Sequence, residues 1–295
     1  MNSERVGVKK KIVVAHSPDA DDIFMYYAIK FGWVGSKDIE FENIALDIET
    51  LNKEALKNSY DVTAISFALY PFIKDDYALL KTAVSFGEGY GPKLVKQKGK
   101  RLKPNFKVAL SGEFTTNALI FKLAYPKARI VYKNFLEIED AVKSGEVDAG
   151  VLIHESILTY DDSLEVEREI WDIWEEFSGG GLPLPLGGMA IRRSLPITRA
   201  IEIEKILTDG VRVADENRAV LSKMLLQRGL IRVDKEKLEK YLDLYANKES
   251  VSLNPLQIKA INKLYELGYE NGYYPQKIDC EEYFVPTEYM DFRFA

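Results

Sequence analysis

The feature that most constrains the fold of this chain is a regular alternation of short apolar segments with amphipathic ones. The apolar runs predict strands at 12–15, 41–46, 62–65, 78–85, 107–110, 130–132 and 147–153. The amphipathic runs between them predict helices at 21–32, 50–58, 67–74, 115–124 and 136–144. This alternation is typical of α/β architecture. After residue 188 the pattern changes and predicts helices at 197–228, 234–245 and 255–271.

Two breaks rich in glycine and proline, at 87–92 and 179–188, divide this pattern. We expect the chain to leave a first domain at one break, build a second domain, and return at the other. This predicts a discontinuous domain one, residues 1–96 plus 188–295, and an inserted domain two, residues 97–187. A chain that crosses twice between two domains forms a hinge, and the cleft between the domains is a common ligand site. Two sequential domains with the C-terminal helices as a cap remain an alternative.

Composition narrows the classes of function. The 295 residues are 46% hydrophobic and 29% charged, as in an ordinary globular protein, and the length suits two domains. A net charge of -6 argues against a nucleic-acid partner, which calls for a surplus of Lys and Arg, but it allows a small anionic ligand. Cys280 is the single cysteine, so no internal disulfide can form.

The N-terminal segment bears on localisation. Three lysines at 9–11 precede an apolar run of only four residues, 12–15. A secretory signal needs roughly seven to fifteen apolar residues. No segment approaches the roughly eighteen apolar residues of a membrane span. We therefore expect a cytoplasmic protein with no membrane partner; the sequence leaves its oligomeric state open.

Histidine is scarce, so any histidine chemistry must use His16 or His154. His154 directly follows the predicted strand 147–153. Ligands in open α/β sheets bind at the carboxyl ends of strands, and imidazole titrates near neutral pH, which suits a general base. A hydrogen-bonded structural histidine at a strand end is the alternative.

Other polar side chains also follow predicted strands. Ser17 and Asp22 come after the first strand, Ser66 after the third, and Thr115 and Thr116 at a predicted helix start in domain two. Helix N-termini suit anions because their backbone N–H groups are free. Helix capping explains the same residues without a ligand. If they bind one, the strand ends of both domains meet at a single small-molecule cleft.

Three aspartates occupy the turn after the first strand: Asp19, Asp21 and Asp22. A metal site is unsupported because no further ligands occur at diagnostic spacing. The carboxylates could accept hydrogen bonds from ligand hydroxyls, or cap the helix. The sequence contains no phosphate loop, dinucleotide fingerprint, zinc spacing or Gly-x-Ser-x-Gly elbow.

Taken together, several short motifs resemble the 1,4-dihydroxy-6-naphthoate synthase family of the futalosine route to menaquinone. They occur in the family's order and span about 17–193, although the helical C-terminus carries none. The motifs are Ser17-Pro18 with Asp22-x-Phe24, Asp47-x-Glu49-Thr50-Leu51-Asn52, Gly89-Tyr90-Gly91-Pro92, Thr115-Thr116, His154-Glu155-Ser156 with Thr159-Tyr160, and Gly181-Leu182-Pro183-Leu184-Pro185-Leu186-Gly187.

The resemblance implies a type II periplasmic-binding-protein fold with two α/β domains. It implies cleavage of cyclic dehypoxanthinyl futalosine to a dihydroxynaphthoate and a small sugar-derived fragment, with no metal and no organic cofactor. The family's general base matches His154. Its ligand-site threonines and serine match Thr115, Thr116 and Ser66, and its aspartate at the first turn matches Asp22.

One departure bears on the substrate. The usual family member reads Ser-Pro-Cys-Pro-Asn-Asp where this chain has residues 17–22 with Asp21 in place of asparagine. An ionised acid only accepts hydrogen bonds, so Asp21 would repel an anionic substrate if it faced the cleft. A related naphthoate isomer is therefore an open alternative.

Two other functions also stay open. One is a solute-binding protein for a small carboxylate. The other is the sister enzyme chorismate dehydratase, in which we do not expect the His154 motif.

Overall fold

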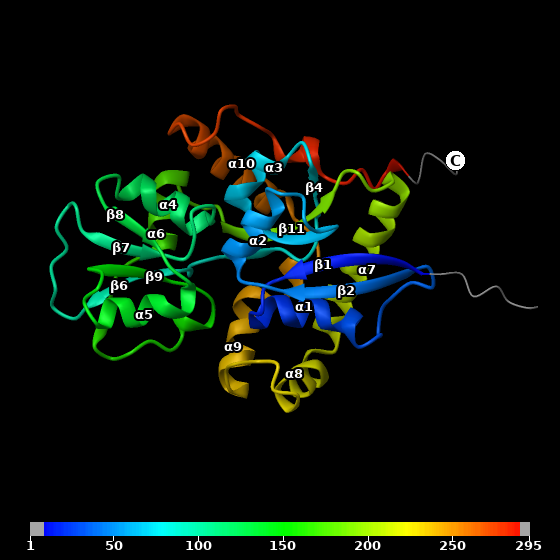
Figure 1. The fold of residues 1–295 in the computed structure, drawn as a ribbon, viewed down its shortest axis with the longest axis horizontal. Coiled ribbons are helices and arrows are strands. Elements are labelled where there is room, and N and C mark those ends of the chain that lie inside the picture. The colour runs from blue at the N-terminus through cyan, green and yellow to red at the C-terminus, as the bar shows by residue number, and fades with distance from the viewer. Residues whose placement is uncertain (1–8, 290–295) are drawn as a thin grey trace, which may run out of the picture.

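The computed structural model describes residues 9–289 and contains two β-sheets joined by two chain crossings (Figure 1). The first sheet has the strand order β2-β1-β3-β11-β4, with β5 paired to β11. Its strands are β1 (Lys10–His16), β2 (Ile39–Ala45), β3 (Val62–Ser66), β4 (Tyr77–Leu79), β5 (Ser85–Gly87) and β11 (Leu184–Arg192). β1 runs parallel to β2 and β3, whereas β11 is antiparallel to its partners.

The second sheet has the order β10-β6-β9-β7-β8 and lies at the left of Figure 1. Its strands are β6 (Lys93–Gln97), β7 (Lys107–Leu110), β8 (Arg129–Tyr132), β9 (Ala149–Leu152) and β10 (Leu164–Glu169). The α/β prediction is thus confirmed. The strands of this sheet all fall between β5 and β11 in the chain, and the boundaries at 96/97 and 187/188 stay a prediction.

Helices cover both sheets. Those in the first 180 residues are α1 (Ala20–Lys30), α2 (Ile48–Ala55), α3 (Tyr70–Ile73), α4 (Thr116–Ala124), α5 (Phe135–Lys143) and α6 (Ile170–Ser178). The later ones are α7 (Ile197–Glu216), α8 (Arg218–Gln227), α9 (Lys235–Tyr245) and α10 (Pro255–Glu270). Short 3₁₀ turns occur at η1 (Phe67–Leu69), η2 (His154–Ile157), η3 (Lys248–Ser250) and η4 (Cys280–Tyr283). Both α7 and α9 pack on α1, so the C-terminal helices build on the first sheet rather than forming a separate unit.

Three sequence predictions are wrong in detail. The expected strand 78–85 is two short strands, β4 and β5, because the backbone turns at Ala83, whose φ is +53°. The expected helix 197–228 breaks at Asn217, where φ is -115° and ψ is 27°, outside the helical region. The expected break 179–188 contains the start of β11. Pro185 is accommodated there because the pairing with β5 shifts register between Pro185 and Gly187.

The packing of α5 on β9 positions the segment that leads into His154. A Cβ atom at Gly150 would lie 2.5 Å from Ile138 Cγ2 and 2.9 Å from Val142 Cγ2. Both neighbours are fully buried, so they have no room to move away. Glycine at this position therefore sets how closely the helix approaches the strand.

We expect Gly150→Ala to lower the free energy of unfolding by about 1–3 kcal/mol, because it overpacks a close helix–strand contact. Urea denaturation measures the change. Gly35→Ala is the control, since a Cβ atom there meets nothing within 4 Å. A Gly150→Ala protein as stable as the control would show that α5 can shift at no cost.

Candidate functional site

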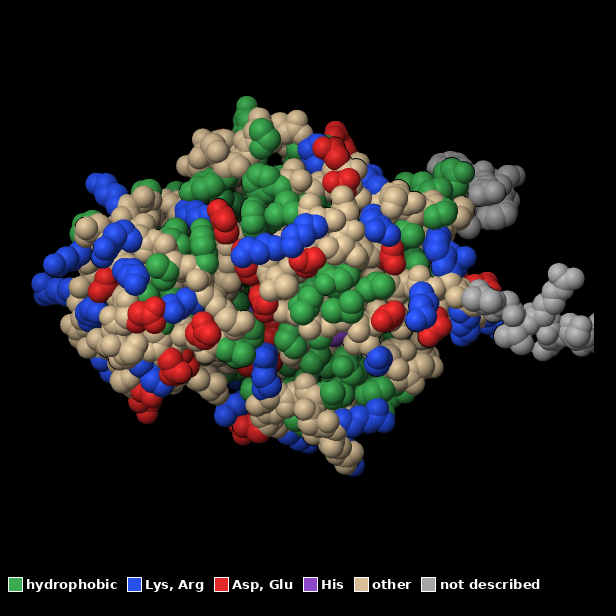
Figure 2. All heavy atoms as spheres, in the orientation of Figure 1, with side chains coloured by type: hydrophobic (Ala, Val, Ile, Leu, Met, Phe, Trp, Pro, Cys, Tyr) green, Lys and Arg blue, Asp and Glu red, His purple; other side chains and the backbone are tan. Residues whose placement is uncertain are grey.

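A cavity with about 750 Å³ of open space lies where the two sheets meet. Figure 2 shows acidic side chains inside the furrow between the two lobes of the molecule. All six residues that the sequence singled out line the cavity: Ser17, Asp22, Ser66, Thr115, Thr116 and His154. The structure therefore brings together side chains from both sheets, as the strand-end argument predicts.

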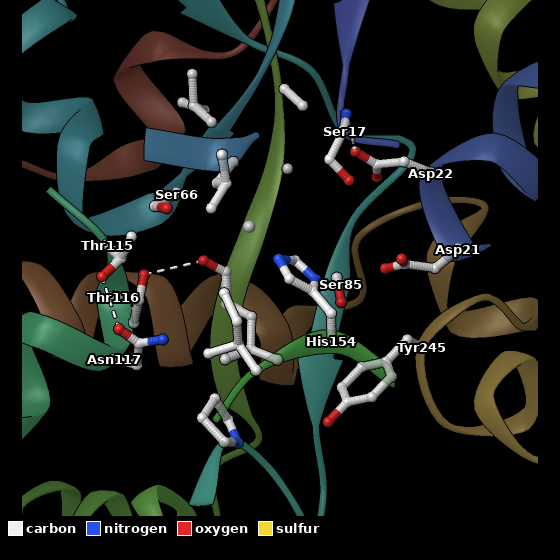
Figure 3. A pocket seen from close by; sticks show the side chains of 18 of the residues that line it. Ser17, Asp21, Asp22, Ser66, Ser85, Thr115, Thr116, Asn117, His154 and Tyr245 are labelled. Carbon is white, nitrogen blue, oxygen red and sulfur yellow. Dashed lines mark hydrogen bonds between the residues drawn. The ribbon is translucent and has the colours of Figure 1, made fainter. Parts of the chain in front are cut away.

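Figure 3 shows two groups of polar side chains with His154 between them. Ser66, Thr115, Thr116 and Asn117 lie on one side of the cavity. The acidic turn between β1 and α1 lies on the other. The cavity thus has a neutral polar wall and an acidic wall, and no Lys or Arg lines it among the described residues.

His154 is held in an unusual backbone conformation at the start of η2, with φ at +55°. Non-glycine residues rarely adopt this left-handed region, and such strain concentrates at functional sites. Its Nδ1 lies 3.0 Å from Asp19 Oδ2, and its ring packs edge-on against Phe135. Its Nε2 is buried and has no hydrogen-bond partner among residues 9–289. One ring nitrogen is therefore anchored to protein and the other is left for a ligand.

The pKa of His154 reflects two opposing effects. Loss of water around the ring lowers the pKa of His154, but the Asp19 carboxylate opposes this by charge and by hydrogen bonding, and the outcome is a pKa raised to about 9. Asp19 itself is fully buried. Burial opposes its ionisation, yet His154, Ser17 and Arg232 outweigh burial and hold the pKa of Asp19 below its ordinary value.

Asp19 shows that simple helix capping does not explain the acidic turn. It occupies the N-cap position of α1, but its side chain makes no capping hydrogen bond. Ser17 Oγ donates to Asp19 at 2.6 Å and Arg232 Nη2 donates to it at 2.5 Å. The sequence marked this aspartate only as part of a cluster, and no motif pointed to Arg232.

Asp22 and His16 both contact the backbone of Ser17 in this turn. Asp22 accepts a hydrogen bond of 2.8 Å from the Ser17 N–H. His16 Nδ1 donates to the Ser17 carbonyl at 2.7 Å, and burial lowers the pKa of His16. His16 is absent from the lining of the main cavity and stacks near Tyr26 instead. Of the two histidines, only His154 faces the candidate ligand site.

On the neutral wall, several hydroxyls are already engaged. Thr115 caps α4 by accepting from the Ala118 N–H, so the capping interpretation holds there. Thr116 donates to the Leu186 carbonyl at 2.9 Å and accepts from the Ala68 N–H at 3.2 Å. Both threonines shape the wall rather than offering a free hydroxyl hydrogen.

Ser66 differs from the threonines. Asn52 accepts from the Ser66 N–H at 3.0 Å and donates to Ser66 Oγ at 3.1 Å. Because the hydroxyl only accepts in this pair, its hydrogen is left for a ligand. Asn117 Oδ1 accepts from Thr115 at 2.6 Å, which leaves the Asn117 amide nitrogen as a second donor. Sequence reasoning found Ser66 and missed Asn117.

The protein itself occupies two backbone amides just before α4. The Glu113 and Phe114 N–H groups donate to the carboxylate of Glu49, at 3.0 and 3.3 Å. Glu49 belongs to α2 beside the first sheet and is buried. A Cβ atom at Gly112 would lie 2.1 Å from Glu49 Oε2, so glycine is required for this approach. Glu49 thus occupies two of the amides near this helix start, those of Glu113 and Phe114.

The described part of the chain contains neither a cluster of metal ligands nor a membrane-spanning helix. No group of three or more His, Cys, Asp or Glu side chains is arranged to hold a metal ion there. Of the helices in residues 9–289, none combines the length and apolar character that crossing a membrane requires.

The fold and the site define a two-domain α/β protein whose ligand cavity lies between its sheets and presents a histidine. The same fold occurs in the aliphatic sulphonate binding protein SsuA of Escherichia coli, a periplasmic protein, with a TM-score of 0.66 and 12% identity over 96% of this chain and 100% of that one. At this identity the likeness shows the fold alone, and it confirms the predicted periplasmic-binding-protein architecture.

Closer similarities define the family. The family described as "Menaquinone biosynthesis" matches residues 12–270, so this chain belongs to it. A 1,4-dihydroxy-6-naphtoate synthase from Streptomyces coelicolor is 30% identical over 89% of this chain and 94% of that protein. An enzyme of the same name from Thermus thermophilus is 35% identical over 61% of this chain and 65% of that protein. Protein AF1704 from Archaeoglobus fulgidus has a crystal structure with a TM-score of 0.83 and 37% identity, covering 89% of this chain and 98% of that one.

Asp21 faces the cavity, but burial and the neighbouring acids Asp22 and Asp19 raise the pKa of Asp21 well above its ordinary value. A neutral carboxyl can both donate and accept, as asparagine does. The raised pKa favours the neutral form of Asp21, and this reduces the repulsion of an anionic ligand that an ionised Asp21 would cause. Tyr241 lies 3.4 Å from Asp21 Oδ1 and can donate to it.

The raised pKa of Asp21 predicts a pH-dependent effect of Asp21→Asn on stability. As pH rises above 3.8, the unfolded state loses a proton that the folded state keeps, so wild-type stability falls relative to the variant. Urea denaturation at about pH 4 and at about pH 8 should show Asp21→Asn gaining stability over wild type only at the higher pH. Asp162→Asn, on the exposed surface, is the control and should follow wild type. An equal difference at both pH values would contradict a neutral Asp21.

Proposed function

We propose that this protein converts cyclic dehypoxanthinyl futalosine to 1,4-dihydroxy-6-naphthoate, or to a closely related isomer, with His154 as the general base. The observation that carries the proposal is the position of His154: it lines the cavity with a buried, unpartnered Nε2 while Asp19 holds Nδ1. Membership in the menaquinone biosynthesis family and the names of the two relatives support the substrate.

In this reaction the base removes a substrate proton and so starts cleavage of a carbon–carbon bond. The sugar-derived fragment leaves, and aromatisation of the new ring helps to drive the reaction. A general base must lie within hydrogen-bond reach of the proton it takes. His154 lines the cavity, and its Nε2 is the imidazole nitrogen that has no partner among the described residues. The protein is thus a lyase-type enzyme that supplies a base, a shaped cavity and polar contacts.

The neutral wall holds the polar groups of the substrate. Ser66 and Asn117 supply the donors that their protein partners leave free. Thr115 and Thr116 define the shape of that wall, and Ser17 and Asp22 order the turn opposite. Because no Lys or Arg among the described residues lines the cavity, neutral donors bind any substrate carboxylate.

A solute-binding protein for a small carboxylate would share the fold and the cavity between the sheets. It would not need a strained histidine with an unpartnered nitrogen, which supports the enzyme over the binding protein. A chorismate dehydratase activity is distinguished by direct assay with chorismate. The relatives are named as biosynthetic enzymes, which supports a cytoplasmic location.

The direct test incubates the purified protein with cyclic dehypoxanthinyl futalosine and follows naphthoate formation by absorbance and mass. We expect turnover by the wild type and its loss in His154→Ala and His154→Asn. Asparagine tolerates the left-handed backbone better than alanine does, so it separates loss of the base from loss of the fold. Absence of turnover by folded wild-type protein would contradict the substrate, and near wild-type turnover by His154→Asn would exclude this histidine as the base.

The pKa of His154 predicts the pH dependence of the reaction. Only the neutral imidazole accepts a proton, and the pKa of about 9 means that the neutral form is reached as pH rises through that value. We expect kcat/KM to rise with pH along a limb whose apparent pKa is about 9, since kcat/KM reports groups of the free enzyme. Rates between pH 6 and pH 10 measure this limb; a profile that is flat or falls across this range would contradict the assignment.

A further inference from the structure

The fully buried Asp19 carboxylate connects three segments that are far apart in the sequence. Its Oδ2 accepts from His154 Nδ1 at 3.0 Å and from Ser17 Oγ at 2.6 Å. Its Oδ1 accepts from Arg232 at 2.5 Å. The donors come from the turn after β1, from η2 beside the second sheet, and from the loop between α8 and α9. Asp19 is absent from the cavity lining, so it reaches the ligand site through His154.

The contact between Asp19 and His154 fixes the imidazole tautomer. An ionised carboxylate only accepts hydrogen bonds, so Nδ1 must carry a hydrogen. In the neutral ring the lone pair is then on Nε2, the nitrogen without a partner among the described residues of this cavity-lining side chain. The carboxylate also stabilises the imidazolium that forms when Nε2 takes a proton, as in other acid–histidine pairs.

Arg232 balances the charge of this pair. Its Nη2 bridges Asp19 Oδ1 and, at 3.2 Å, Glu155 Oε2. Glu155 Oε1 accepts in turn from the Ala20 N–H at 3.1 Å. The guanidinium lies 5.3 Å from the centre of the Phe135 ring, the same ring that packs against His154. One cation therefore compensates two buried acids that would otherwise both raise the basicity of the histidine.

We infer that Asp19 is a positioning residue for the base, and that Arg232 sets the charge at Asp19 and thereby tunes the basicity of His154. The inference rests on the proposed function, because it gives the base its orientation. Since Asp19 follows β1 of the first sheet and His154 follows β9 of the second, the pair is complete only when the two sheets approach each other. The approach of the two sheets, which forms the cavity between them, therefore also brings Asp19 into contact with the base His154.

Proton-sensitive NMR of the two histidines tests the inference without any turnover. His16 and His154 are the only histidines of the chain, so His154→Asn assigns both signals. Besides Asp19 and Arg232, the ring faces the titratable groups Asp21 and Glu155, and α9 contributes Tyr241 and Tyr245 to the cavity; all stay unchanged in the test variants.

Opposite shifts are the expected result. Asp19→Asn removes the negative partner and should lower the pKa of His154 by about 1–3 units. Arg232→Gln removes a positive charge and should raise the pKa of His154 by a smaller amount. Asp61→Asn, which removes an acid paired with Arg192 outside the cavity, is the control and should leave His154 unchanged. A general loss of structure would not move one signal in opposite directions. If both variants shift it the same way, or neither shifts it, the inference is wrong.

Kinetics supply the second readout. Asp19→Asn should lower kcat by roughly a hundredfold or more while changing KM little, because the substrate still binds the neutral wall but the base is misoriented. Its limb in kcat/KM should move to lower pH, and that of Arg232→Gln to higher pH. Unchanged limbs in variants that turn over would overturn the inference. If the wild type itself does not turn over the substrate while the NMR shifts occur, the proposed substrate fails and the coupling of Asp19 to His154 stands.

Discussion

The burial of the Asp19 carboxylate is the constraint on which the rest of the site depends. An ionised acid that is fully buried is costly unless every lone pair finds a partner. Removing one partner of such a group typically costs about 3–5 kcal/mol. The partners are Ser17 from the same turn, His154 from beside the second sheet and Arg232 from the C-terminal helices. The hydrogen bonds to this one carboxylate therefore fix the conformation of the turn, the orientation of His154 and the approach of the two sheets.

Two aspartates in the same turn illustrate how partners decide charge. Asp19 is held ionised because His154 and Arg232 outweigh its burial, and its pKa is lowered. Asp21 is also buried, but its neighbours Asp22 and Asp19 are acids, so its pKa is raised well above the ordinary value. The turn thus combines one acid whose ionised form is favoured with one whose neutral form is favoured. An acidic sequence run does not by itself make an acidic site.

The candidate site was only partly predictable from sequence. The rule that ligands meet strand ends placed Ser66 and His154 correctly at the cavity. The occupation of the Glu113 and Phe114 amides before α4 could not be predicted, because nothing in the sequence shows that Glu49 reaches across from α2. Arg232 could not be predicted, since it lies in a loop without a motif and meets Asp19 only through the packing of α9 on α1.

The sequence by itself determined the α/β class, the helical C-terminal region and the family. Hydrophobic periodicity and local motifs are short-range properties of the sequence, so they can be recognised before the fold is known. The same reasoning failed where the outcome depended on distant partners, as at Asn217 between α7 and α8 and at Pro185 within β11. Only the tertiary structure decided that Asp19 holds Nδ1 of His154 and that the ionised form of Asp19 is favoured, because both follow from contacts between residues more than a hundred positions apart.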